Sequence, residues 1–171
     1  GYLLEAPAQE DAAQLGQTEA AICAFAAQHP DIRLTAAIVP NAWGVLSEKL
    51  PAGAPVEDQK ALIDAIDQAM PDVRTANLTE ALRSRRSEPL YYRTDHHWTS
   101  LGAYYAYQQL CDALGLTPFD TAAHTALTAD CFYGTHYSKA RTWNAVPDTI
   151  TWYDLPNQLT IYNVTAEVGG P

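Results

Sequence analysis

The chain has 171 residues, which is the length of one domain and is enough to bury a core. Hydrophobic residues make up 47% and charged residues 18%, a composition typical of globular rather than disordered proteins. Ten basic and twenty acidic residues give a formal net charge of −10, which disfavours nucleic acids and anionic membrane surfaces as partners. No apolar run approaches the roughly 18 residues of a membrane span.

The first half of the chain alternates between helical and extended patterns. Apolar residues at near-helical spacing predict a helix over 10–28, which Pro30 ends. A β-rich apolar run predicts a buried strand over 32–39. An amphipathic pattern predicts a second helix over 58–70, and a second strand is expected over 73–78. Helices and strands that alternate in this way favour an α/β layered fold.

The second half begins with a short predicted helix over 79–84 and an extended piece that ends in Asp95-His96-His97-Trp98. A long helix follows over 100–114. Thr99 or Ser100 can cap its start, and Gly115 stops it.

The last third of the chain is expected to contain more loop. Residues 117–130 are predicted to form a loop with a short helix, and 136–139 an ordinary loop. Strands over 150–153 and 159–164, joined by Leu155-Pro156-Asn157-Gln158, are expected to form a C-terminal β-hairpin.

Three cysteines, Cys23, Cys111 and Cys131, lie far apart and form no CxxC pair. Their spacing predicts no zinc or redox motif, and their odd number argues against a disulfide scaffold. Cys23 and Cys111 are expected to be small buried apolar residues inside helices. The chain opens at Gly1 without Met and shows no signal peptide, so we expect a processed piece from which a leader or anchor has been removed.

The segment before the long helix carries the reactive side chains. In an extended backbone, residues i and i+2 project to the same side, which would place Asp95 and His97 on one face and His96 on the other. A carboxylate beside an imidazole holds the ring in one tautomer and stabilises its cationic form, as in a nucleophilic triad. Near neutral pH the imidazole is the natural general base.

Three other interpretations of this segment compete. Asp and His are metal ligands, but the remaining histidines are scattered and the two adjacent imidazoles would point apart. A helix-entry loop rich in Asp, His and Thr can simply satisfy backbone donors. The segment can also belong to a binding module, in which Trp and Tyr contact sugar rings while Asp95 and His97 are inert. The sequence alone leaves all three open.

A family resemblance favours the catalytic interpretation. The stretch Tyr91-Tyr92-Arg93-Thr94-Asp95-His96-His97-Trp98-Thr99, with Gly102 and Tyr105 after it, resembles the hallmark of the DHHW protein family. That family is similar to the SGNH-hydrolase-like domains of the alginate O-acetylation proteins. Further blocks fit the resemblance: Val39-Pro40, Leu50-Pro51, Asp58-Gln59, Phe132-Tyr133-Gly134-Thr135, Tyr137-Ser138-Lys139 and Pro147-Asp148-Thr149-Ile150.

The resemblance implies a fold and a site. The fold would be a layered SGNH-like (flavodoxin-like), mostly parallel sheet flanked by helices, incomplete here, with the C-terminal β-hairpin appended. The relatives read Asp-x-His-Trp at the motif, so Asp95 and His97 would be the catalytic pair and His96 the variable position. The relatives supply a serine nucleophile from a later Asp-Ser block on a strand-to-helix turn.

The nucleophile is missing from this chain. None of the five serines follows an Asp or lies in a Gly-x-Ser-x-Gly elbow. Ser138, next to Lys139, is the least implausible local candidate. We therefore expect the serine to lie beyond Pro171, with 1–171 forming one SGNH-hydrolase-like domain that is the N-terminal part of a longer family domain.

The expected function is acyl-ester chemistry, as an O-acetyltransferase or esterase on an extracytoplasmic glycan. It would require no metal and no organic cofactor, and the piece alone would be inactive. The resemblance implies a polysaccharide substrate and an exported protein, or one anchored by a membrane segment outside this chain. The alternatives are a non-catalytic polysaccharide-binding or scaffolding domain, and a metal-dependent hydrolase.

Overall fold

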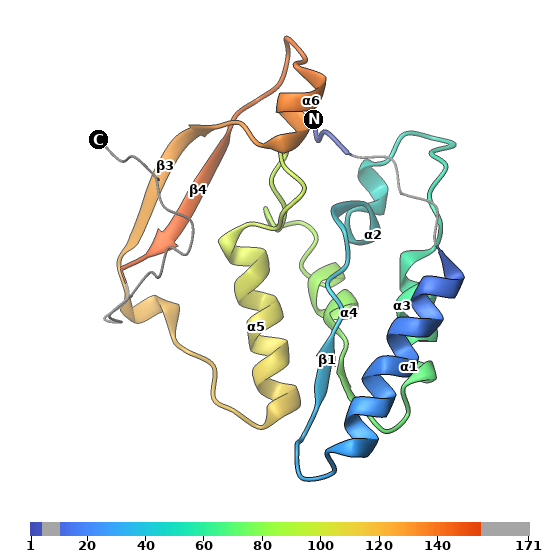
Figure 1. The fold of residues 1–171 in the computed structure, drawn as a ribbon. Helices are drawn as coiled ribbons and strands as arrows, with labels where there is room; N and C mark the ends of the chain where they lie inside the picture. Colours follow the sequence, from blue (N-terminus) through green and yellow to red (C-terminus); the bar gives the residue numbers. More distant parts are fainter. Residues whose placement is uncertain (5–10, 155–171) are drawn as a thin grey trace, which may run out of the picture.

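Short strands alternate with helices along the chain in the computed structural model, which describes residues 1–4 and 11–154 (Figure 1). No helix in these two ranges is both long and apolar enough to span a membrane. The elements in chain order are α1 Ala12–Gln28, β1 Thr35–Ala37, α2 Ala42–Val45, η1 Ser47–Lys49, α3 Gln59–Ala69, β2 Arg74–Ala76, α4 Leu78–Arg83, α5 Ser100–Leu114, η2 Thr121–Ala123, β3 Ala126–Phe132, α6 Thr135–Ala140 and β4 Asp148–Tyr153.

The longer helices begin where short polar side chains can cap them. The carboxylates of Asp11 and Asp58 and the amide oxygen of Asn77 accept hydrogen bonds from first-turn N–H groups of α1, α3 and α4. The Thr99 hydroxyl does the same for α5, which ends at Gly115 in the left-handed conformation with φ 70°. The predicted cap and stop of α5 are therefore confirmed.

Strands β1 and β2 form a parallel pair, with Thr35 opposite Arg74 and Ala37 opposite Ala76. Figure 1 shows β1 with α5 on one side and α1 and α3 on the other. Helices on both sides of parallel strands are the expected α/β arrangement. Among the described residues, however, the parallel sheet has only these two strands, fewer than the layered sheet that the sequence predicts.

The second sheet is the antiparallel pair of β3 and β4. The prediction of a loop over 117–130 is wrong for β3, which is almost wholly exposed and therefore lacks a buried-strand pattern. The register shifts between Ala129 and Phe132, where Cys131 has φ 64°. The strand predicted over 150–153 is β4, whereas the predicted strand over 159–164 lies outside the described residues.

The core joins α2, α4, α5 and the segment before the Asp-His-His-Trp motif. Val45, Leu46, Leu82 and Leu90 are at most 1% exposed and pack in one cluster. The buried Tyr91 hydroxyl donates a 2.6 Å hydrogen bond to the carbonyl of Pro40. The strand-like segment that enters the motif is thus packed inside the core.

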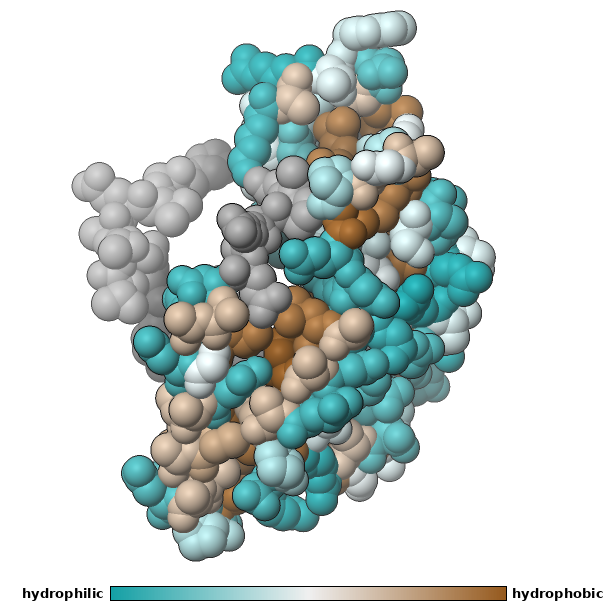
Figure 2. All heavy atoms as spheres, turned by 90° about the vertical axis from the view of Figure 1, so that its right-hand side faces the viewer, coloured by the Kyte–Doolittle hydropathy of each residue, from teal (hydrophilic) through white to brown (hydrophobic). Residues whose placement is uncertain are grey.

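The cysteines divide between the core and the surface. Cys111 is buried, as expected, while Cys23 is only partly buried and Cys131 is exposed. Helix α1, which carries Cys23, has no buried residue. Viewed from the α1 side, the surface is a mosaic of hydrophilic and apolar residues (Figure 2).

Helix α5 approaches the core so closely that one glycine is required. A Cβ on Gly102 would lie 2.3 Å from the carbonyl oxygen of Leu90, which is backbone and cannot rotate away.

We expect Gly102→Ala to lower the free energy of unfolding by about 1–3 kcal/mol in urea titrations, because the helix must shift. Gly16→Ala is the control. It lies in α1 with nothing within 4 Å of an added Cβ, and should stabilise the fold by about 0.5–1 kcal/mol. Equal stability of the Gly102→Ala variant and the wild type would contradict the close packing.

Candidate active site

The Asp-His-His-Trp segment forms a tight loop and not the predicted extended piece. Tyr91 and Trp98 form an isolated antiparallel bridge, and the Tyr92 N–H donates to the His97 carbonyl at 3.2 Å. Residues 93–96 therefore make a turn, with His97 on its returning arm. The loop leads directly into α5, whose start is fixed in the core.

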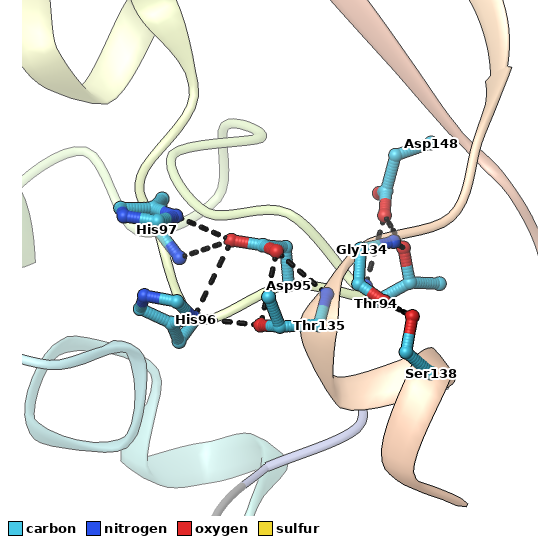
Figure 3. Close-up of polar contacts among 8 residues, drawn as sticks. All are labelled: Thr94, Asp95, His96, His97, Gly134, Thr135, Ser138 and Asp148. Carbon is cyan, nitrogen blue, oxygen red and sulfur yellow. Dashed lines mark hydrogen bonds and ion pairs between the residues drawn. The ribbon is translucent and has the colours of Figure 1, made fainter. Parts of the chain in front are cut away.

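Asp95 and His97 lie within hydrogen-bond distance. His97 Nδ1 is 2.6 Å from Asp95 Oδ1, which also accepts the His97 backbone N–H at 2.9 Å (Figure 3). An ionised carboxylate can only accept, so His97 Nδ1 carries the proton in this pair. The lone pair of Nε2 is then available, and the His97 side chain is 64% exposed. This arrangement can act as a general base, although the catalytic role stays a prediction.

His96 lies beside His97, and the expectation that the two imidazoles point apart is wrong. Their ring centroids are 3.8 Å apart, because the segment turns instead of extending. His96 Nδ1 lies 2.7 Å from Thr135 Oγ1 and 3.7 Å from Asp95 Oδ1. Asp95 thus has one imidazole in direct contact and a second connected to it through the Thr135 hydroxyl.

The second oxygen of Asp95 fixes the start of α6. Oδ2 accepts the Thr135 N–H at 2.8 Å and the Thr135 hydroxyl at 3.1 Å. The carboxylate therefore takes the place of a capping side chain, which Gly134 cannot supply. A Cβ on Gly134 would lie 2.2 Å from the Asp95 Cβ, so the glycine allows the helix to approach. The sequence predicts a loop here, and α6 is found instead.

Asp95 is held as an anion. Burial raises the pKa of its carboxyl, since only 5% of the side chain is exposed. The hydrogen bonds from the backbone N–H groups of Thr135 and His97, from the His97 ring and from the Thr135 hydroxyl together outweigh burial. They hold the pKa of the Asp95 carboxyl well below its usual range. A permanent negative charge is what stabilises an imidazolium when His97 takes a proton.

A second buried carboxylate holds the opposite end of the loop. Asp148, at the start of β4, accepts the backbone N–H groups of Arg93 and Thr94, each at 2.8 Å. The resemblance points to the blocks that contain Asp148 and Thr135, but assigns them no role. Their function in the loop depends on contacts about 40 to 55 residues away in sequence, which no local pattern indicates.

Ser138 is not brought to His97. Its hydroxyl donates to the carbonyl of Gly134, one turn back in α6, at 3.1 Å. Figure 3 shows Ser138 on the other side of Asp95 from the two imidazoles. The local serine candidate therefore has no contact with the proposed base in this structure.

Asp95, His96 and His97 also offer ligand atoms that lie within 4.8 Å of one another, as a metal site requires. The expectation that the two imidazoles point apart therefore no longer argues against a metal here, whereas the other histidines remain outside this group. The carboxylate, however, already receives two donors on each oxygen. His97 Nδ1 faces this carboxylate, so only Nε2 of that ring is available to a cation.

A cleft of about 1030 Å³ lies beside the loop. Tyr2, Tyr92 and Tyr153 line it together with charged groups that include Arg86 and Arg93. Neither Asp95 nor His97 is among its lining residues. The first residues of the loop therefore face the cleft, whereas the imidazole that would act as base does not line it.

The sequence matches the family model described as DHHW protein over residues 40–167. The chain belongs to the DHHW protein family. A DHHW family protein from Eubacterium siraeum is similar in structure, with a TM-score of 0.73 and 26% identity, over 81% of this chain and 47% of that one.

Two further solved structures share the fold of this DHHW protein. The O-acetyltransferase domain of Pseudomonas putida AlgJ has a TM-score of 0.60 and 24% identity, over 84% of this chain and 58% of its own. Bacillus cereus PatB1, solved with a sulfonyl adduct, has a TM-score of 0.66 and 21% identity, over 89% of this chain and 53% of its own. The chain spans about half the length of these structures. The comparison with curated proteins gave no match.

The depressed pKa of the Asp95 carboxyl predicts a pH-dependent contribution to stability. Because the folded-state pKa lies below the unfolded value of about 3.9, ionised Asp95 stabilises the fold above that pH. The contribution is lost as pH falls below about 4 toward the folded-state value. We expect Asp95→Asn to lower the free energy of unfolding by about 2 kcal/mol at pH 7, and the difference from wild type to shrink in urea titrations at decreasing pH.

Asp72→Asn is the matched control, since Asp72 is exposed on the turn before β2. The substitution removes the same charge but leaves the contacts that cap α6 intact. The stability of the Asp72→Asn variant should therefore remain close to that of the wild type at both pH extremes. A difference for Asp95→Asn that stays constant with pH would contradict the ionised state.

Proposed function

We propose that the chain contributes the acid–base pair of an SGNH-like acyl-ester enzyme, an O-acetyltransferase or esterase. His97 is the general base and Asp95 orients it. The single observation that carries the proposal is the 2.6 Å contact between His97 Nδ1 and Asp95 Oδ1, with the far side of the ring open. Family membership and the likeness in fold to an O-acetyltransferase domain support it.

The chemistry follows from the tautomer. In the proposed first step, His97 Nε2 takes the proton of a serine hydroxyl while the serine oxygen bonds to the acyl carbonyl carbon. The ester C–O bond then breaks, and the departing alcohol oxygen receives that proton from Nε2. In the second step a glycan hydroxyl or water gives its proton to His97 Nε2 and attacks the acyl-serine. The serine oxygen then receives that proton as the acyl group passes to the acceptor. Asp95 stays ionised and stabilises the imidazolium throughout.

The nucleophile is proposed to lie outside these 171 residues. The contact of Ser138 with its own helix backbone supports this, because that hydroxyl is directed away from His97. We propose that 1–171 is one SGNH-hydrolase-like domain, part of a longer family domain that also supplies the remaining strands of a larger parallel sheet. The chain alone is then inactive.

The proposed substrate is an extracytoplasmic polysaccharide, with the protein exported or membrane-anchored by a segment outside this chain. The resemblance of the Asp-His-His-Trp segment to the alginate O-acetylation proteins supports an acyl-accepting glycan, and the likeness in fold to an O-acetyltransferase domain supports the acetyl transfer. No metal or organic cofactor is part of the proposed reaction, because acyl transfer by a serine and an imidazole needs neither.

A non-catalytic glycan-binding or scaffolding domain is the second candidate. The cleft beside the loop favours it, because tyrosine rings, charged groups and hydroxyls are side chains that contact sugars, and His97 is not among them. The continuation of the gene separates the two candidates. An Asp-Ser dipeptide after an apolar strand supports the enzyme, and its absence supports the binding domain.

The enzyme proposal predicts activity of the full-length protein on an acetyl-ester reporter. We expect His97→Ala and Asp95→Asn each to lower kcat/KM by at least about a hundredfold, because each removes general base catalysis or its orientation. His29→Ala is the control, since this imidazole is exposed at the end of α1. Undiminished activity in His97→Ala would sink the assignment, as would stoichiometric zinc in the purified protein that is lost in the same variant.

A further inference from the structure

We propose that Asp148 is a positioning residue for the Asp95–His97 pair, an inference that rests on the proposed function. Asp148 contacts neither of the two catalytic side chains. It holds the two residues that precede Asp95 in the loop, and thereby determines where the Asp95 carboxylate lies.

Asp148 is a buried carboxylate with a full set of partners. Only 6% of its side chain is exposed. Oδ1 accepts the Arg93 N–H at 2.8 Å and the Arg93 Nε–H at 3.4 Å. Oδ2 accepts the Thr94 N–H at 2.8 Å and the Thr94 hydroxyl at 2.6 Å. A buried charge persists only when it is paired and hydrogen-bonded in this way, so the contacts hold the loop strongly.

All four donors come from the residues directly before Asp95. Two successive N–H groups bound to one carboxylate fix the orientation of both peptide planes. The Arg93 guanidinium also donates to the Pro147 carbonyl at 3.3 Å, and the Arg93 carbonyl accepts the Leu3 N–H at 2.7 Å. Few backbone torsions are then left between the clamped peptides and the Asp95 side chain.

The Thr94 hydroxyl connects this clamp to α6. It donates to Asp148 Oδ2 and accepts the Gly134 N–H at 3.1 Å. Gly134 precedes Thr135, which donates to Asp95. The Thr94 carbonyl also accepts the Tyr137 N–H at 3.1 Å. Asp148 and Asp95 therefore hold the same two segments, the loop and the start of α6, from opposite sides (Figure 3).

The role predicted for Asp148 is more specific than stability. Without the clamp, the peptides before Asp95 can rotate and the carboxylate can leave His97 Nδ1. The imidazole then loses the interaction that keeps its proton on Nδ1, and both tautomers become populated. A residue that merely stabilised the β3–β4 sheet would leave the His97 tautomer unchanged.

The test is the ¹⁵N NMR spectrum of the imidazoles in the 171-residue chain, whose ring shifts distinguish an Nδ1–H from an Nε2–H tautomer. In Asp148→Asn we expect the His97 signals to move toward a mixture of tautomers, at a temperature where unfolding curves show the protein folded. Asp130→Asn is the matched control. Asp130 lies on β3 and accepts the Thr149 hydroxyl, so the charge change is the same but the loop is untouched.

A second pair of variants keeps the test decisive if Asp148→Asn does not fold. Thr94→Val removes the hydroxyl that joins Asp148 to Gly134, and Thr94→Ser retains it. We expect the tautomer mixture in Thr94→Val and the wild-type spectrum in Thr94→Ser. A folded Asp148→Asn or Thr94→Val variant with the wild-type His97 spectrum would overturn the proposal.

In the full-length enzyme we expect Asp148→Asn to lower kcat about tenfold to a hundredfold with little change in KM, as for misplacement of a catalytic group. The spectrum does not depend on activity. Failure of the proposed function, seen as activity that survives His97→Ala, is therefore distinguishable from failure of this inference, seen as an unchanged tautomer.

Discussion

The four hydrogen bonds on the Asp95 carboxylate are the interaction on which the rest of the site depends. They connect the turn at Asp95 to the backbone of His97, orient the His97 ring and cap the first turn of α6. Four donors on one buried anion also explain why its charge persists, because each favours the ionised form. One side chain therefore determines the local fold, the tautomer and the electrostatics together.

Around this anion the molecule has a rigid side and an open side. Leu90 and Tyr91, which lead into the loop, are buried in the core, and α5 follows the loop without an intervening linker. The imidazoles, in contrast, are at least half exposed. General base catalysis requires an imidazole that is held on one side and accessible on the other, since the ring must meet another reactant.

Local patterns predicted the elements that local interactions determine. Apolar periodicity sufficed to predict α1 and α3, and apolar periodicity with capping residues sufficed for α5. Strand β3 was missed because its residues are exposed, and only its pairing with β4 makes it a strand. The pairing of Asp95 with His97 could be anticipated from their spacing, although the backbone is a turn. The stacked His96 could not, because extended geometry directs it away. Thr135 and Asp148 reach the loop from distant segments, which a single sequence does not reveal.

The shared use of Asp95 has a thermodynamic consequence for α6. The carboxylate caps this short helix on one oxygen and orients His97 with the other. Docking of the helix and orientation of the ring therefore depend on the same carboxylate, and each must change the free energy of the other by an equal amount. A molecule that binds the exposed side of α6 and tightens its docking would strengthen the contacts that hold the Asp95 carboxylate against His97 Nδ1, without touching the ring. The start of α6 and the orientation of the His97 ring are in this sense coupled through one side chain.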